Sequence, residues 1–180
     1  MAPLRVLNIP NLLTLLRMLL VPVFIYLVVE ERTWTALVVF AAAGLTDALD
    51  GFIARTFGQK TDLGAYMDPI ADKMLLVSAF VALAAKDMIP AWLCALVILR
   101  DIVIMVGIKW LELAGRVVRI VPSMAGKVTT VLQISTVVYA MMTAGAPDLL
   151  YRALVAVTAA FTVYTGFDYV WREVKIQTGR

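Results

Sequence analysis

The chain has 180 residues, of which 62% are hydrophobic and only 16% are charged. Soluble domains are usually about half apolar, so this composition predicts an integral membrane protein surrounded by lipids and excludes a disordered chain. The net charge of +3 is too small and too scattered to indicate nucleic-acid binding. With no His and one Cys, a zinc, haem or iron–sulfur centre has almost no ligands, so any bound metal is expected to be held by oxygen.

Six stretches are apolar enough to be membrane-spanning helices, each of which needs about 20 mostly apolar residues. The expected spans are Pro10–Val29, Thr33–Ile53, Asp68–Ala85, Pro90–Lys109, Ser123–Gly145 and Leu149–Val170. Six spans place both termini on one side, where the loops contain ten Lys and Arg residues against three on the other side. The positive-inside rule therefore predicts cytoplasmic termini. The fold prediction is one all-α domain over residues 1–180, a bundle of six transmembrane helices.

Four aspartates gather at the expected cytoplasmic ends of the second and third spans. Asp47 and Asp50 are three residues apart, and Asp68 and Asp72 are four apart, so each pair shares one helical face. The short connection between the spans makes them antiparallel neighbours with both pairs at the same depth. Four converging carboxylates repel one another unless a cation neutralises them, and oxygen-only ligands favour Mg²⁺ or Mn²⁺, with room for two ions. The sequence thus predicts a cytoplasm-facing metal site.

Small residues surround these carboxylates. Gly51 follows Asp50 directly, and Ala54 lies one turn beyond Asp50. Gly64 lies one turn before Asp68 on the same face. Little side-chain bulk then stands beside the predicted metal, which leaves room for a large ligand. Arg55, at the edge of the cluster, would suit a phosphate group.

Two other interpretations of the cluster rank lower. A buried ion pair that only fixes packing explains a lone intramembrane Asp beside an Arg, but not four Asp at two helical spacings. A divalent-cation transporter would use the same carboxylates, but it needs a polar route to the far face. The residues available for that route are Ser78, Gln133, Ser135 and Thr136. Because the acids gather at one membrane face, an enzyme is the better prediction.

Written out, residues 47–72 follow the pattern D-x2-D-G-x2-A-R-x8-G-x3-D-x3-D with every fixed position filled. This pattern resembles the motif of the CDP-alcohol phosphatidyltransferases, and the six-span layout fits that family as well. The resemblance implies an enzyme, often a homodimer, that transfers a phosphatidyl group from CDP-diacylglycerol to an alcohol and releases CMP. It also implies a place in phospholipid biosynthesis and in a bacterial inner membrane.

The resemblance assigns roles residue by residue. Asp47, Asp50 and Asp68 would hold the divalent ions, and Asp72 would lie near them as a further ligand and as the general base. Gly51, Ala54 and Arg55 would lie against the cytidine nucleotide, and Gly64 would make room for it. The chemistry of these residue types agrees with the assigned roles, since bound metal ions neutralise a diphosphate while a carboxylate takes the proton of the attacking hydroxyl.

The start of the chain offers three further polar residues, Asn11, Thr14 and Arg17, which recur every three residues on one face. This segment resembles the N-terminus both of bacterial phosphatidylglycerophosphate synthases and of CMP-forming cardiolipin synthases. Asn11 and Thr14 would then contact the nucleotide. The alternative is that Arg17 extends along the helix surface to water and that Thr14 bonds its own backbone.

A second basic group indicates an anionic acceptor. Its candidate phosphate ligands are Arg100, Arg116, Arg119 and Lys127. The positive-inside rule explains Arg116, but Arg100 and Lys127 adjoin or enter apolar spans. Glycerol 3-phosphate and phosphatidylglycerol both carry a phosphate, and we rank glycerol 3-phosphate first. Asp101 and Thr129 depart from the Arg-Glu and Gly-Lys-x-Lys-Thr runs usual in phosphatidylglycerophosphate synthases, which keeps the cardiolipin synthases as the alternative.

Overall fold

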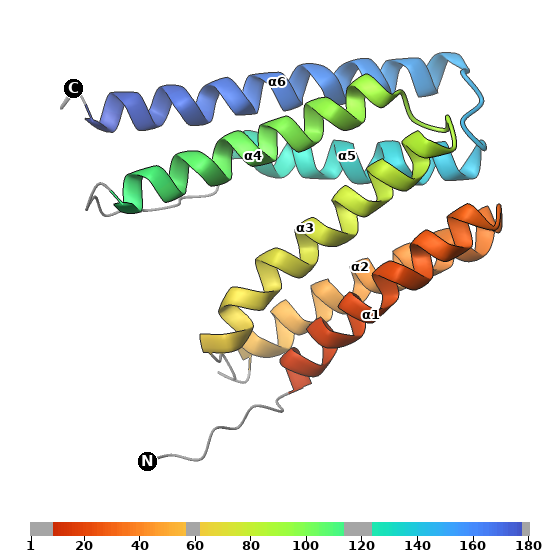
Figure 1. Ribbon diagram of the computed structural model, residues 1–180, viewed down its shortest axis with the longest axis horizontal. Helices are drawn as coiled ribbons and strands as arrows, with labels where there is room; N and C mark the ends of the chain where they lie inside the picture. Colours follow the sequence, from red (N-terminus) through yellow and green to blue (C-terminus); the bar gives the residue numbers. More distant parts are fainter. Residues whose placement is uncertain (1–8, 57–61, 114–123, 178–180) are drawn as a thin grey trace. The chain divides into compact units, whose positions relative to one another are not determined.

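The computed structural model describes residues 9–56, 62–113 and 124–177, with side chains described for residues 12–46, 73–110, 124–169 and Trp171. Over these residues the backbone is entirely helical apart from its turns (Figure 1). The helices are α1 Ile9–Val29, α2 Thr33–Thr56, α3 Asp62–Ala85, α4 Ala91–Leu113, α5 Met124–Met142 and α6 Leu149–Gln177. The all-α prediction is confirmed, with one helix for each of the six expected spans.

Several helix ends differ from the expected span ends. α3 begins at Asp62, six residues before Asp68, and α6 continues to Gln177, seven residues beyond Val170. Hydropathy marks where apolar residues stop, whereas a helix continues into polar residues as long as its backbone hydrogen bonds form. α5 stops at Met142 because Ala144 and Gly145 have positive φ angles of 49° and 74°, which end a right-handed helix.

Three of the helices are long and apolar enough to cross a membrane, counting only the described residues. These stretches are Leu12–Val29, Ala91–Trp110 and Leu149–Tyr169. Thr33–Thr46 and Lys73–Ala85 are shorter apolar stretches in the helices that contain the four aspartates. The apolar helices identify an integral membrane protein.

The chain divides into two compact units, Met1–Lys86 with α1 to α3 and Asp87–Arg180 with α4 to α6. In the first unit, α1 packs against both α2 and α3. Its inner stripe is Thr14, Arg17, Val21, Phe24, Leu27 and Val28, all buried at helical spacing. The rings of Phe24 and Phe40 lie 5.6 Å apart and join α1 to α2.

A tight turn connects α1 to α2. The Arg32 amide donates to the Leu27 carbonyl and the Glu31 amide donates to the Val28 carbonyl. Glu31 has a φ of 61°, so the turn is a Schellman motif with Glu31 at the left-handed position. The turn reverses the chain at once, and α1 and α2 therefore run antiparallel side by side (Figure 1).

In the second unit, α6 packs against both α4 and α5. Three polar pairs cross between α5 and α6, and their side chains are all at most 3% exposed. The pairs are Thr129 with Thr165 at 3.4 Å, Gln133 with Thr162 at 3.4 Å, and Thr136 with Thr158 at 2.8 Å. We call these six residues the hydroxyl ladder. All three pairs form together in the antiparallel register of α5 and α6.

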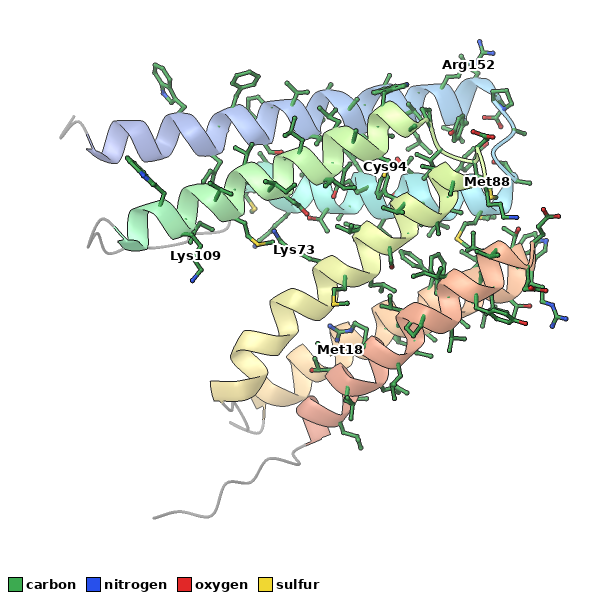
Figure 2. All side chains as sticks on the ribbon, in the orientation of Figure 1. Met18, Lys73, Met88, Cys94, Lys109 and Arg152 are labelled. Atoms are coloured by element: carbon green, nitrogen blue, oxygen red, sulfur yellow. The ribbon has the colours of Figure 1, made fainter. Side chains whose placement is uncertain are left out.

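The turn end of the second unit is tied together by Tyr151, whose hydroxyl donates to the Met88 carbonyl at 2.8 Å. Figure 2 shows Met88 at this end of the unit and Lys109 near the opposite end of α4. Asp148 caps α6, because its carboxylate accepts the Tyr151 amide proton at 2.7 Å. The Tyr139 hydroxyl also donates to this carboxylate.

Candidate functional site

The four aspartates of the motif occupy matching levels of α2 and α3. Asp50 lies six residues before the end of α2 at Thr56, and Asp68 lies six residues after the start of α3 at Asp62. Asp47 and Asp72 lie nine residues and ten residues from the same helix ends. At about 1.5 Å of rise per residue, the distances of Asp47 and Asp72 from these helix ends differ by about 1.5 Å. The four positions thus lie at similar distances from the connected ends of α2 and α3, and the convergence of their carboxylates stays a prediction.

These positions also follow the helical spacing of the buried residues in α2 and α3. In α2 the buried residues are Ala36, Phe40 and Ala43, and Asp47 and Asp50 follow Ala43 by four and seven residues. In α3 the stripe includes Leu75, Ala79 and Ala82, and Asp72 and Asp68 precede Leu75 by three and seven residues. Steps of three, four and seven residues return to one face of a helix. The acidic positions therefore share the helical spacing of the buried residues in α2 and α3, the two helices that α1 contacts.

The side chains of residues 47–72 lie outside the described ones, so the predicted metal ligands have no described geometry. This applies to all four aspartates and to the predicted nucleotide residues Gly51, Ala54, Arg55 and Gly64, although each of these lies within α2 or α3. Among the described side chains, no group of three or more His, Cys, Asp or Glu could hold a metal ion. The donor set in the motif consists of carboxylates alone, which is the chemistry that Mg²⁺ and Mn²⁺ accept.

On α1, Thr14 and Arg17 are both fully buried at 0% exposure. Arg17 therefore does not extend along the helix surface to water, and that part of the alternative is wrong. Its burial places a cation inside the unit that contains the motif. The side chain of Asn11 lies outside the described ones, so its predicted contact with a nucleotide stays a prediction.

In the second unit, Arg100 is largely buried beside Asp101. The Arg100 Nη1 atom donates to the Asp101 Oδ1 atom at 2.8 Å, and the two side chains are only 17% and 14% exposed. The Cγ atom of Arg100 lies 3.7 Å from where a β-carbon on Gly166 would be. The Arg100 Nε atom is buried and has no hydrogen-bond partner among the described atoms, so this guanidinium can still donate to an anion.

The other predicted acceptor residues differ in their placement. Lys127 is exposed in the first turn of α5, where its ammonium is free to reach a ligand. Arg116 and Arg119 fall within residues 114–123, which lie outside the described part of the chain. Arg100 and Lys127 thus lie in the same unit, and their joint binding of a phosphate stays a prediction.

Comparison with known proteins decides the family. A family model described as CDP-alcohol phosphatidyltransferase matches residues 7–164, most of the chain. The chain belongs to the CDP-alcohol phosphatidyltransferase family. The resemblance seen in residues 47–72 is confirmed, and the prediction of an enzyme with it. Members of this family generally depend on a divalent metal ion.

Curated relatives of this phosphatidyltransferase fall into the two predicted groups. A probable phosphatidylglycerophosphate synthase of Mycobacterium tuberculosis is 37% identical over 95% of this chain and 84% of its own length. The CDP-diacylglycerol–glycerol-3-phosphate 3-phosphatidyltransferase of Escherichia coli is 33% identical over 91% of this chain and 93% of its own length. A CMP-forming cardiolipin synthase of Rattus norvegicus is 34% identical over 96% of this chain and 65% of its own length.

The structure explains one of the two departures of this phosphatidyltransferase from the usual pattern. Thr129 is fully buried, donates to the Ala125 carbonyl at 2.9 Å, and meets Thr165 and the Phe161 carbonyl of α6 at 3.4 Å. A lysine at this position would have to enter the α5–α6 interface. Position 129 therefore belongs to the packing of α5 against α6.

Sequence reasoning missed the ladder. The sequence suggests Gln133 and Thr136 only as part of a polar route across the membrane, yet both form hydrogen bonds to threonines of α6. Ser78, another candidate for that route, donates to the Leu75 carbonyl of its own helix at 2.9 Å. The available signal was the matched spacing of Thr129, Gln133 and Thr136 with Thr158, Thr162 and Thr165, four and then three residues apart on both helices.

Proposed function

We propose that this enzyme is a phosphatidylglycerophosphate synthase, which transfers the phosphatidyl group of CDP-diacylglycerol to glycerol 3-phosphate and releases CMP. The observation that carries the proposal is the complete acidic motif, whose four aspartates lie in the helices α2 and α3. The E. coli relative, whose name states this reaction, corresponds to the chain over 93% of its own length.

In this proposal the phosphatidyl phosphorus is attacked by the acceptor hydroxyl. The new bond joins the acceptor oxygen to that phosphorus, and the phosphorus–oxygen bond to CMP breaks. Asp72 takes the proton of the attacking hydroxyl as general base. Asp47, Asp50 and Asp68, together with Asp72, would hold Mg²⁺ or Mn²⁺, two ions in all. When bound, these ions supply charge neutralisation on the diphosphate and on departing CMP.

The nucleotide would be bound by the small and polar residues around the motif. These are Asn11, Thr14, Gly51, Ala54, Arg55 and Gly64. Gly51, Ala54 and Gly64 keep side-chain bulk away from the acidic positions, and Arg55 offers charged donors to phosphate.

The acceptor would be bound by Arg100 and Lys127, with Arg116 and Arg119 as further candidates. A buried guanidinium with an unused Nε donor supports an anionic acceptor. The alternative acceptor is phosphatidylglycerol, which would make the enzyme a CMP-forming cardiolipin synthase. It is favoured by the Arg100–Asp101 sequence and by the rat relative, but that relative matches over only 65% of its own length.

The membrane arrangement is part of the proposal. The family match over residues 7–164 includes helices of both units, which supports one catalytic domain of six spans over residues 1–180. The Lys and Arg distribution supports cytoplasmic termini and a site open to the cytoplasm. A bacterial inner membrane and a homodimer complete the proposal.

Purified protein in lipid micelles, given CDP-diacylglycerol and Mg²⁺, tests the function through CMP release and chromatography of the lipid products. We expect turnover with glycerol 3-phosphate. Turnover only with phosphatidylglycerol would establish the cardiolipin synthase instead. Flux of divalent cations into proteoliposomes, with no CMP release, would overturn both in favour of a transporter.

A further inference from the structure

Arg17 is the only cation with no exposed surface among the described side chains, and neither the motif nor the proposed mechanism uses it. A guanidinium stays protonated in proteins, and a buried charge is costly unless an opposite charge accompanies it. The surroundings of Arg17 are α2 and α3, because these are the helices that α1 contacts. Its counter-charge is therefore expected within the first unit.

The contact between Phe24 and Phe40 fixes which part of α2 lies opposite Arg17. The two rings are 5.6 Å apart, one on α1 and one on α2. Arg17 lies seven residues before Phe24, and Asp47 lies seven residues after Phe40. Because the helices are antiparallel, both steps run in the same direction in space. Seven residues make about two helical turns, so each step also returns to the same face.

The acidic residues of the first unit outside the motif do not lie opposite Arg17. Glu30 and Glu31 are exposed at the opposite end of α1, and Glu31 is bonded to Lys86 at 3.2 Å. Asp62 begins α3, ten residues before the level of Asp72. Within the motif, Asp50 lies about one turn closer to the end of α2 than Asp47 does. On α2, Asp47 is therefore the acidic position that matches Arg17 in both level and helical spacing.

We propose that Arg17 is a positioning residue, the fixed counter-ion of Asp47, which orients that carboxylate for the divalent ion. The proposal deepens the proposed function, since Asp47 is a metal ligand there. A permanent cation reduces the charge of the four carboxylates from four negative to three when no ion is bound, so the unit can fold before it binds metal. Partners of metal-ligating carboxylates hold the ligand in its binding orientation.

A double-mutant cycle on the full chain tests the pair, with thermal unfolding followed in EDTA. Arg17→Met keeps the length of the side chain without its charge, and Asp47→Asn keeps the shape of the carboxylate. Each single variant leaves one buried charge without its partner, whereas the double variant is neutral. We expect the double variant to lose less stability than the two single losses combined, by about tenfold in the unfolding equilibrium constant.

The matched control is the cycle of Arg17→Met with Asp50→Asn, whose losses should add. Arg17→Lys keeps the charge and should recover most of the stability lost in Arg17→Met. Additive losses for Arg17 and Asp47, or equal coupling of Arg17 to Asp50 or, in the corresponding cycle with Asp72→Asn, to Asp72, overturn the proposal. If a single variant does not fold, recovery of folded protein in the double variant supports the pair, and no recovery overturns it.

Adding Mn²⁺ separates this inference from the proposed function. In wild type, Mn²⁺ should raise the unfolding midpoint, because a ligand that binds only the folded state stabilises it. The double variant should regain stability in EDTA but show a smaller rise with Mn²⁺, since one ligand is missing. A full rise would remove Asp47 from the metal site and overturn the positioning role of Arg17, while coupling in EDTA would still establish the ion pair.

Discussion

The two units bury polar groups of different kinds. In the first unit the inner stripe of α1 buries an arginine, Arg17, and α2 and α3 contain the four aspartates of the motif. In the second unit the stripe between α5 and α6 contains five threonines and a glutamine, which pair across the interface. Charges in a membrane are costly and mark function, whereas hydroxyls bond nearby carbonyls and fix register. The contrast separates the chemical part of the chain from the scaffold.

The largest expected effect is on the chemistry of the first unit. Asp72→Asn removes the proposed base and should lower the rate of CMP release by about 10²- to 10⁴-fold. The variant should stay folded, because it removes one of four mutually repelling carboxylates. Asp87→Asn is the matched control, since Asp87 is exposed, has a φ of 56° that asparagine tolerates, and lies outside the motif. Activity retained in Asp72→Asn would remove this residue as the base.

A substitution in the scaffold should have the opposite profile. A β-carbon on Gly145 would lie 2.7 Å from the Met88 Cα atom, and Gly145 has a φ of 74°. Gly145→Ala should therefore lower the free energy of unfolding by about 1–3 kcal/mol, measured by thermal unfolding. Turnover per folded molecule should not change. Gly44→Ala is the control, because nothing lies within 4 Å of a β-carbon there; equal losses in the two variants would contradict the account.

The ladder offers a smaller and more specific test of the scaffold. Thr136→Val keeps the shape of the side chain but removes the 2.8 Å bond to Thr158. Interhelical hydrogen bonds in membranes contribute about 0.6 kcal/mol on average, so we expect a loss near that value. Thr130→Val is the control, because Thr130 is exposed and bonds only the Gly126 carbonyl of its own helix. The same loss in both variants would mean that the interhelical bond adds no stability.

How far the sequence predicts this enzyme differs between its two units. The motif in residues 47–72 predicts the family, which the family match confirms, because carboxylates at helical spacing in an apolar chain are too costly to serve packing alone. The burial of Arg17 could not be predicted from one helix, since it depends on α2 and α3 covering that face. The Phe24–Phe40 contact that sets the register of α1 is likewise visible only after folding.

Helix ends were predicted least well. Pro69 favours a helix start near Asp68, yet α3 begins at Asp62 and continues through Pro69. A proline removes one backbone hydrogen bond, and that cost is tolerated within a spanning helix when neighbouring groups satisfy the freed carbonyl. The hydroxyl ladder was missed because isolated threonines in a helix usually bond their own backbone, and pairing requires the antiparallel partner.

The smallest expected effect is a pH dependence at the cap of α6. Hydrogen bonds from the Tyr139 hydroxyl and from the Tyr151 amide hold the pKa of Asp148 below its usual range. A carboxylate with a lowered folded pKa stabilises the protein above its unfolded pKa of about 3.9 and loses that contribution as the pH falls through the folded pKa. Asp148→Asn should therefore flatten the fall in unfolding midpoint below about pH 4. An unchanged acid profile would assign the fall to other carboxylates.

The central claim is that the acidic positions of α2 and α3 form one divalent-metal site for the transfer of a phosphatidyl group. The most direct measurement is anomalous scattering from crystals of the protein grown with Mn²⁺ and CDP-diacylglycerol. The account predicts two manganese peaks between α2 and α3, within ligand distance of the Asp47, Asp50 and Asp68 carboxylates and beside the diphosphate. A diphosphate bound without manganese at these residues, or manganese bound only in the second unit, would contradict it.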